Sequence, residues 1–322
     1  MSIILLSNES GLKVELSPFG ASIRSIQSPS GQHLVLSYQD ENEWFNNKYY
    51  LGVTVGRVAN RISGSSYKTE TGLVSLSANE EGNHLHGGFK GLSSVNWQID
   101  EVNDEQNSVT FSYLSYCGEE GYPGDVLFKV TYQLINNNLC INMRANASVQ
   151  TPISLTNHVY WQLGNTQNTI KYHRIHLPAR IRLEKTEENT PSGEYLAVEN
   201  THYDFTQPAI LEPRLINRGF DDYYLLDPKG SDELKLHGII ENPENNFKVS
   251  VFSTAPGCQF YTGYYLSGET KNITGEIMGS YTGLCIEPHN LPDAVNNKHF
   301  LTSFYGPKKP YSHTLVYEID AH

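Results

Sequence analysis

The stretch LFKVTYQLINNNLCINMRA, residues 127–145, decides the fold class of this chain. In its first half Phe128, Val130, Tyr132 and Leu134 alternate with polar residues, which is the period of a half-buried β-strand. The second half continues the strand pattern after three asparagines, and asparagine favours turns. We therefore predict two antiparallel strands, at 127–134 and 139–145, joined by a turn at 136–138.

Runs with the same period recur along the chain, at 11–17, 21–26, 108–114, 248–253 and 313–319. One helical turn is expected at 41–45, and we find no run of 12 or more residues with the helical period. The composition does not change sharply at any point, and no linker rich in Pro or Ser interrupts the pattern. The sequence therefore predicts a single all-β domain over residues 1–322, a large antiparallel β-sandwich.

Composition excludes several classes of partner. The 322 residues carry a formal charge of −12, and no basic block interleaves with aromatic residues, so a nucleic-acid partner is not expected. An acidic surface repels anionic membranes. The apolar run at 3–6 is too short for a signal peptide, and no apolar stretch is long enough to span a bilayer. We expect a cytoplasmic protein with no membrane partner, whose widely spaced cysteines are free thiols, namely Cys117, Cys140, Cys258 and Cys285.

Imidazole, carboxylate, amide and guanidinium groups gather in short clusters between the predicted strands. The clusters are GRVANR at 56–61, NHLHGG at 83–88, TNHVYW at 156–161, GFDD at 219–222 and CIEPHN at 285–290. Imidazole and carboxylate are the side chains best suited to exchange protons near neutral pH. Their presence on separate strands of a β scaffold indicates proton-transfer chemistry on a polar, neutral ligand.

Each of these residues also has an ordinary structural interpretation. His158 is either a strand-end histidine bonded to a carbonyl or a general acid. Glu287, which follows an apolar run, is either solvated or a buried base. His84 and His86 form a His-x-His pair that would suit a metal ion, but no third ligand has a supporting motif. Asp221 belongs to a Gly-aromatic-Asp turn that is often purely local.

In order and spacing the clusters resemble the aldose 1-epimerase (galactose mutarotase) family, from about residue 20 to the C-terminus. The segments that carry the resemblance are GVTVGRVANRI (52–62), NHLHGG (83–88), GEEGYPGD (118–125), TPISLTNH (151–158), PGCQFYTG (256–263), Glu287 and LPDA (291–294). The resemblance implies a large β-sandwich of the galactose mutarotase-like supersandwich type. It also implies an isomerase that interconverts the α and β anomers of free aldohexoses such as glucose or galactose. Such an enzyme needs no cofactor and no metal, and it acts as a monomer or homodimer on a monosaccharide.

The resemblance assigns roles to individual residues. It implies that Glu287 is the general base at the C1 hydroxyl and His158 the general acid at the ring oxygen, with His86 hydrogen-bonded near that oxygen. Burial against Cys285 and Leu291 is expected to raise the pKa of Glu287 toward the working pH. The residues implied for binding the sugar hydroxyls are Asn60, Arg61, Asp221 and Gln259.

Other residues of the clusters receive structural roles or remain open. We expect Arg57 to be a structural ion-pair partner and His84 to be structural. Tyr160 or Trp161 is expected either to stack on the apolar face of the sugar or to belong to the core. Because Arg61 is the one clear cation of the assigned pocket, neutral sugars are expected to be preferred over hexose phosphates.

The chain departs from the family pattern at Asp222, at Trp161-Gln162 and at Pro288-His289. These departures bear on the preferred sugar more than on the reaction. Two alternatives remain, a non-catalytic sugar-binding module on the same scaffold and a glycosidase that uses Asp221 and Glu287. The first has no need of both proton carriers, and the second leaves His158 without a role.

Overall fold

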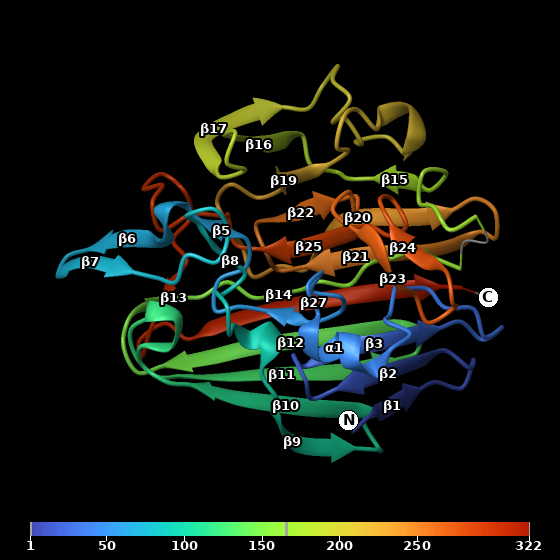
Figure 1. The fold of residues 1–322 in the computed structure, drawn as a ribbon, viewed down its shortest axis with the longest axis horizontal. Coiled ribbons are helices and arrows are strands. Elements are labelled where there is room, and N and C mark those ends of the chain that lie inside the picture. The colour runs from blue at the N-terminus through green and yellow to red at the C-terminus, as the bar shows by residue number, and fades with distance from the viewer. Residues whose placement is uncertain (1, 165–166, 322) are drawn as a thin grey trace.

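A computed structural model describes residues 2–164 and 167–321 of the chain. Two antiparallel sheets form its main layers (Figure 1). The larger has nine strands in the order β18 (Ala209–Ile210), β15 (Arg174–His176), β20 (Lys235–Asn242), β21 (Phe247–Ser253), β27 (Tyr311–Asp320), β12 (Asn138–Ala147), β11 (Val126–Ile135), β10 (Ser108–Ser115) and β9 (Gln98–Asn103). The smaller has five, in the order β17 (Pro191–Ala197), β16 (Ile181–Lys185), β19 (Asp221–Leu225), β22 (Gly257–Tyr261) and β25 (Cys285–His289).

Smaller elements surround the two layers. One three-stranded sheet contains β1 (Ile4–Ser7), β2 (Lys13–Ser17) and β3 (Ser22–Gln27). The two-stranded pairs are β4 (Thr54–Val55) with β14 (Thr156–Asn157), β5 (Arg61–Ile62) with β8 (His84–Leu85), β6 (Ser66–Thr69) with β7 (Gly72–Ser75), β13 (Thr151–Pro152) with β26 (Phe304–Tyr305), and β23 (Ser267–Lys271) with β24 (Ile277–Gly279). Short 3-10 turns lie at Ser63–Ser65, Leu92–Ser94, Glu119–Gly121 and Glu212–Arg214.

The predicted hairpin at 127–145 is confirmed, with one change at its turn. β11 and β12 pair from Val126 opposite Ala147 to Ile135 opposite Asn138. The connection therefore has two residues rather than three, and Asn136 takes a φ of 51°, a left-handed conformation that asparagine tolerates. The other predicted strands correspond to β2, β3, β10, β21 and β27.

The expected helical turn is also present. It is α1 (Glu41–Asn46), and the side chain of Asp40 caps it by accepting a hydrogen bond from the Asn42 amide. Within the part of the chain that the structure describes, α1 is the only α-helix, in agreement with the all-β prediction.

The core lies between the nine-stranded sheet and the layers that cover it. At one end β1–β3 lie beside β10–β12 (Figure 1), and the Tyr132 hydroxyl of β11 donates to the Ala21 carbonyl. At the other end the five-stranded sheet covers β20 and β21, where Gly238 faces Ile286 of β25. A side chain at position 238 would meet the Ile286 methyl group at 2.7 Å, so glycine permits this close approach. Side chains on one face of β22 and β25 therefore pack in the core, and side chains on the other face form the candidate site.

Candidate active site

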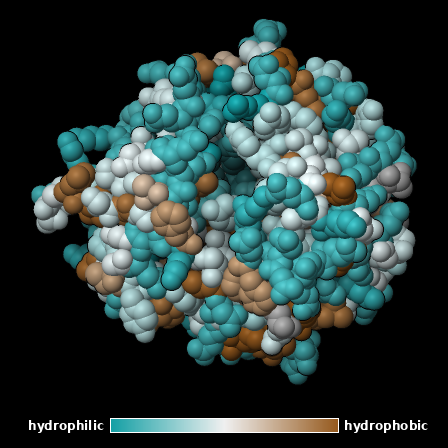
Figure 2. All heavy atoms as spheres, viewed as in Figure 1, coloured by the Kyte–Doolittle hydropathy of each residue, from teal (hydrophilic) through white to brown (hydrophobic). Residues whose placement is uncertain are grey.

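Three strands of the smaller sheet place the predicted residues on one face. Gln259 of β22 lies directly opposite Glu287 of β25 on one side and Tyr223 of β19 on the other. Asp221 lies in the neighbouring row, opposite Tyr261. Because side chains alternate along a strand, all five project to the same side of the sheet. The space-filling view is hollowed near its centre, over the place where β22 and β25 lie in Figure 1 (Figure 2).

Glu287 is the buried carboxylate of this face. Its side chain is 4% exposed. Burial, and then the negative charge of Asp221, raise the pKa of Glu287 well above its ordinary value. The direction agrees with the expectation from the sequence, and it means that Glu287 holds a proton more readily than a surface glutamate does.

His158 meets Glu287 from a different part of the chain. It follows β14, and its backbone is fixed by hydrogen bonds from its amide to the Val53 carbonyl and from the Gly52 amide to its carbonyl. Nε2 of His158 lies 3.6 Å from Oε2 of Glu287, and Nδ1 lies 3.6 Å from Sγ of Cys285. Burial lowers the pKa of His158 to about 4. A readily protonated carboxyl group thus faces a readily deprotonated imidazole.

His86 is held in one tautomer by Asn60. The Asn60 amide donates to Nδ1 of His86 at 3.2 Å, and the His86 amide donates to the Asn60 carbonyl at 3.1 Å. Burial and the neighbouring His158 lower the pKa of His86 well below its ordinary value. Since Nδ1 accepts a hydrogen bond and the ring is neutral, the proton sits on Nε2, which is available as a donor to a ligand.

Tyr50 is a site residue that the sequence did not identify. Its ring centroid lies 4.7 Å from that of His86 and 5.9 Å from that of His158, and the two imidazoles lie 5.4 Å apart. Tyr160 stacks on His158 at 5.0 Å. Aromatic packing therefore orients His158 in addition to its polar contacts.

Asn60, Gln259 and Asp221 form a chain of hydrogen bonds along the site. Nδ2 of Asn60 donates to Oε1 of Gln259 at 3.1 Å, and Nε2 of Gln259 donates to Oδ1 of Asp221 at 2.6 Å. Each member keeps further donor or acceptor capacity for a ligand. The three residues named from the sequence are thus brought together, and their orientations depend on one another.

Arg61 forms an ion pair that the sequence did not predict. Its Nε and Nη2 donate to the two carboxylate oxygens of Glu80 at 2.6 and 2.7 Å. Arg57 was expected to be the paired arginine, and the structure corrects this. Within residues 2–164 and 167–321, its guanidinium donates to the Ser115 hydroxyl and to the carbonyls of Ser115, Tyr116 and Pro123.

His84 turns away from His86. Its Nδ1 donates to the Ser77 carbonyl at 2.7 Å, so its Nε2 accepts from the Tyr122 hydroxyl at 2.8 Å. The His-x-His pair therefore does not point at one ion. Among the residues that the structure describes, the cluster of donor atoms that could hold a metal is His158, Cys285 and Glu287, within 4.8 Å of one another.

Two of the departures from the family pattern, Asp222 and Trp161, lie away from the face that carries the site. Asp222 lies on the face opposite Asp221, 3.6 Å from Arg182 and 3.8 Å from Lys185. Trp161 is fully buried against Tyr317, which places it in the core rather than on a sugar.

His289 is the departure that lies on the same face of β25 as Glu287. It is buried there beside Tyr223, with its ring centroid 5.2 Å from that of the tyrosine. Its burial lowers the pKa of the ring to about 4, so His289 adds a neutral imidazole to the surroundings of Glu287.

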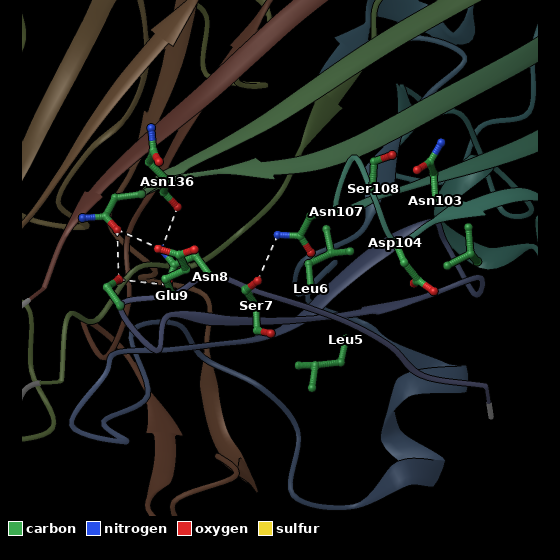
Figure 3. Close-up of a pocket in the computed structure, with 13 residues that line it drawn as sticks. Leu5, Leu6, Ser7, Asn8, Glu9, Asn103, Asp104, Asn107, Ser108 and Asn136 are labelled. Atoms are coloured by element: carbon green, nitrogen blue, oxygen red, sulfur yellow. Dashed lines mark hydrogen bonds between the residues drawn. The ribbon is translucent and has the colours of Figure 1, made fainter.

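Another depression lies between β1 and the turn that joins β9 to β10, with a volume of about 700 Å³ (Figure 3). Asparagine amides dominate it and are bonded to nearby backbone. Asn8 donates to the Asn136 carbonyl at 2.7 Å, and Asn107 donates to the Ser7 carbonyl at 3.0 Å. Neither imidazole nor thiol groups occur among the described residues that line it. The described part of the depression is lined by the carboxylates of Glu9 and Asp104 but lacks the imidazole groups that the smaller sheet sets beside its carboxylates.

Comparison with known proteins identifies the family of the chain. The family model described as aldose 1-epimerase matches residues 2–318. The chain is 35% identical to galactose mutarotase of Homo sapiens over 315 residues, which cover 95% of this chain and 91% of that protein. It is 30% identical to aldose 1-epimerase of Escherichia coli (strain K12) over 333 residues, covering 99% and 95%. The crystal structure of an aldose epimerase homologue from C. elegans superposes with a TM-score of 0.91 at 26% identity over 99% of both chains.

Proposed function

Since the chain belongs to the aldose 1-epimerase family and is an isomerase that interconverts the α and β anomers of free aldohexoses, we propose that Glu287 and His158 carry its two proton transfers. The observation that supports this assignment is the 3.6 Å approach of His158 Nε2 to Glu287 Oε2, with both side chains buried. Acid and base of different chemical type, held at one point, are what ring opening requires.

In the proposed reaction the Glu287 carboxylate removes the proton of the C1 hydroxyl. Protonated His158 gives its Nε2 proton to the ring oxygen as the bond between C1 and that oxygen breaks. The product is the open aldehyde with a free hydroxyl. After rotation about the bond from C1 to C2, the hydroxyl attacks the other face of the carbonyl and the two residues reverse their roles. No electrons are gained or lost, so the reaction calls for no redox cofactor.

The working pair holds a single proton. Ionised Glu287 with protonated His158 contains as many protons as protonated Glu287 with neutral His158, so the two forms interconvert by moving one proton between them. The raised pKa of Glu287 and the pKa of about 4 for His158 favour the neutral form before the sugar arrives. Hydrogen bonds from the sugar hydroxyl to the carboxylate then favour the ionised form in which reaction begins.

The remaining assigned residues bind and orient the sugar in this proposal. His86 donates from Nε2 near the ring oxygen. Asn60, Arg61, Asp221 and Gln259 bind hydroxyl groups. Hydrogen bonds join Asn60, Gln259 and Asp221, and Glu80 holds Arg61, before the ligand enters. Preorganised donors of this kind lose little entropy on binding.

The rival functions fit this arrangement less well. A non-catalytic sugar-binding module would not need His158 and Glu287 beside each other in a buried position. A glycosidase would use Asp221 and Glu287 and leave His158 idle. We therefore keep the isomerase assignment and place the monosaccharide on the face of β19, β22 and β25.

Location and assembly belong to the proposal as well. No helix within the described residues is long and apolar enough to cross a membrane. The four cysteines are free, which fits a reducing compartment, and we propose a cytoplasmic monomer or homodimer. Neither a nucleic acid nor a membrane is a proposed partner.

An anomerisation assay over a panel of freshly dissolved α-anomers tests the substrate part of the proposal. Polarimetry reports glucose and galactose, and NMR exchange between anomers reports glucose 6-phosphate. We expect kcat/KM for the neutral hexoses well above that for the phosphate ester, because Asp221 and Glu287 face the ligand and Glu80 offsets Arg61. A tenfold preference for the phosphate ester would contradict the proposed substrate class.

A further inference from the structure

Glu80 forms an ion pair with Arg61, the cation assigned to the sugar pocket. Its carboxylate takes both Nε and Nη2 of Arg61 in a bidentate pair at 2.6 and 2.7 Å. The Arg61 side chain is 11% exposed and that of Glu80 is 29% exposed, so water screens the pair only in part. The edge of a guanidinium that best binds a carboxylate or phosphate is therefore already occupied.

Hydrogen bonds within the loop around Glu80 hold its carboxylate beside Arg61. Glu80 and Asn83 exchange backbone hydrogen bonds of 3.1 and 2.7 Å, which close a tight turn. The side chain of Asn79 forms two hydrogen bonds with the backbone of Leu85: its Oδ1 accepts from the Leu85 amide at 2.7 Å, and its Nδ2 donates to the Leu85 carbonyl at 2.9 Å. Leu85 in turn pairs with Arg61 across β5 and β8. The contact between Glu80 and Arg61 thus follows from the backbone pairing and does not depend on a flexible surface loop.

The net charge of the sugar pocket bears on whether it selects neutral or anionic sugars. With Arg61 offset by Glu80, the charge of Asp221 makes the residues assigned to the sugar hydroxyls, taken together with Glu80, net negative. We propose that Glu80 is a specificity-determining residue that makes the pocket select neutral aldoses over aldoses that carry a carboxylate or a phosphate. The inference rests on the proposed function of this site and names the residue that sets its charge.

The test compares glucose with glucuronate, an aldose that keeps a free anomeric carbon and adds one negative charge. Both are assayed by NMR exchange between anomers at low ionic strength, and the readout is the ratio of kcat/KM for glucuronate to that for glucose. In Glu80→Gln and Glu80→Ala one negative charge is removed 2.6–2.7 Å from the guanidinium of Arg61, which is assigned to the sugar hydroxyls. At the effective dielectric constant of a partly buried site, the ratio should rise about tenfold or more.

Two further variants separate charge from geometry. Glu81→Gln removes the same charge from the adjacent exposed residue, so its ratio should stay within about twofold of the unmodified protein. Glu80→Asp keeps the charge but shortens the side chain, so KM for glucose should rise while the ratio stays nearly constant. Two neutral variants at position 80 keep the test available if one of them fails to fold.

The outcomes distinguish this inference from the function on which it rests. If the unmodified protein does not anomerise glucose, the proposed function fails. If it does, and the ratio in the Glu80 variants is unchanged or equals that of Glu81→Gln, the role of Glu80 in specificity is refuted while the function stands.

Discussion

Replacing Asp221 with asparagine should move the whole pH profile of the enzyme to lower pH. The negative charge of Asp221 raises the pKa of Glu287, second only to burial, and partly counteracts the lowering that burial imposes on the pKa of His158. Removing that charge makes ionised Glu287 easier to form and protonated His158 harder to form. Both pKa values fall, so both limbs of the profile shift in the same direction.

The spacing of the strands gives the size of the shift. Asp221 lies on β19 and Glu287 on β25, and both strands pair with β22 between them. Two strand spacings of about 4.8 Å across the sheet, and a two-residue offset of about 7 Å along it, separate the charges by about 12 Å. At an effective dielectric constant of about 20, two unit charges at that distance interact by about 1.4 kcal/mol, which corresponds to about one pKa unit. We therefore expect a shift of about one pH unit.

The assay is kcat/KM against pH, because this quantity reports the pKa values of the free enzyme. Asp222→Asn is the matched control, since it removes a neighbouring carboxylate that faces the other side of β19, near Arg182 and Lys185. Its profile should move by less than about 0.3 pH unit, because Asp222 faces away from the site and, unlike Asp221, is not among the charges that shift the pKa of Glu287 or His158. A profile of Asp221→Asn that stays in place, or moves to higher pH, would refute the reasoning.

The remaining predictions concern binding, metal dependence and the core. Arg61→Ala and Asp221→Ala should each raise KM, because each variant loses hydrogen bonds to a charged group that contribute about 1.5–3 kcal/mol to the free energy of binding. Unchanged kinetics in folded variants would place the sugar elsewhere. Excess EDTA should leave the rate unaltered, since proton transfer between Glu287 and His158 needs no Lewis acid; activity that is lost and then restored by a divalent ion would contradict this. Trp161→Ala should lower the free energy of unfolding by about 3–5 kcal/mol, measured by denaturant titration, because the indole is fully buried against Tyr317, and a loss below about 1 kcal/mol would contradict its core role.

The strands of this fold could be predicted because their signal is local. In β11 and β12 the alternation alone placed both strands, although each is longer than predicted and the turn is one residue shorter. The assembly of the site is not a local property. Nothing near His158 in the sequence indicates that its ring meets Glu287, and the resemblance to a family supplied that pairing.

The contacts missed from the sequence depend on tertiary packing. Glu80 and Glu81 are adjacent and identical in type, and only the pairing of β5 with β8 decides that Glu80 reaches Arg61. Tyr50 gave no signal, because its stacking on His158 joins segments more than one hundred residues apart in the sequence. The expected contact of Cys285 with the site, by contrast, followed from local spacing, since a residue two positions before Glu287 in a strand shares its face.

The central claim, that Glu287 and His158 exchange protons with the sugar, is tested most directly by the turnover of Glu287→Gln, His158→Asn and the double variant on freshly dissolved α-galactose. Gln and Asn keep approximate shape and hydrogen bonding but cannot act as the base or the acid. Each single variant should lose about 10²–10⁴ in kcat, the usual contribution of positioned acid–base catalysis. Because the two residues act as one unit, the double variant should lose less than the product of the single losses. Turnover close to that of the unmodified protein in either folded single variant would contradict the claim.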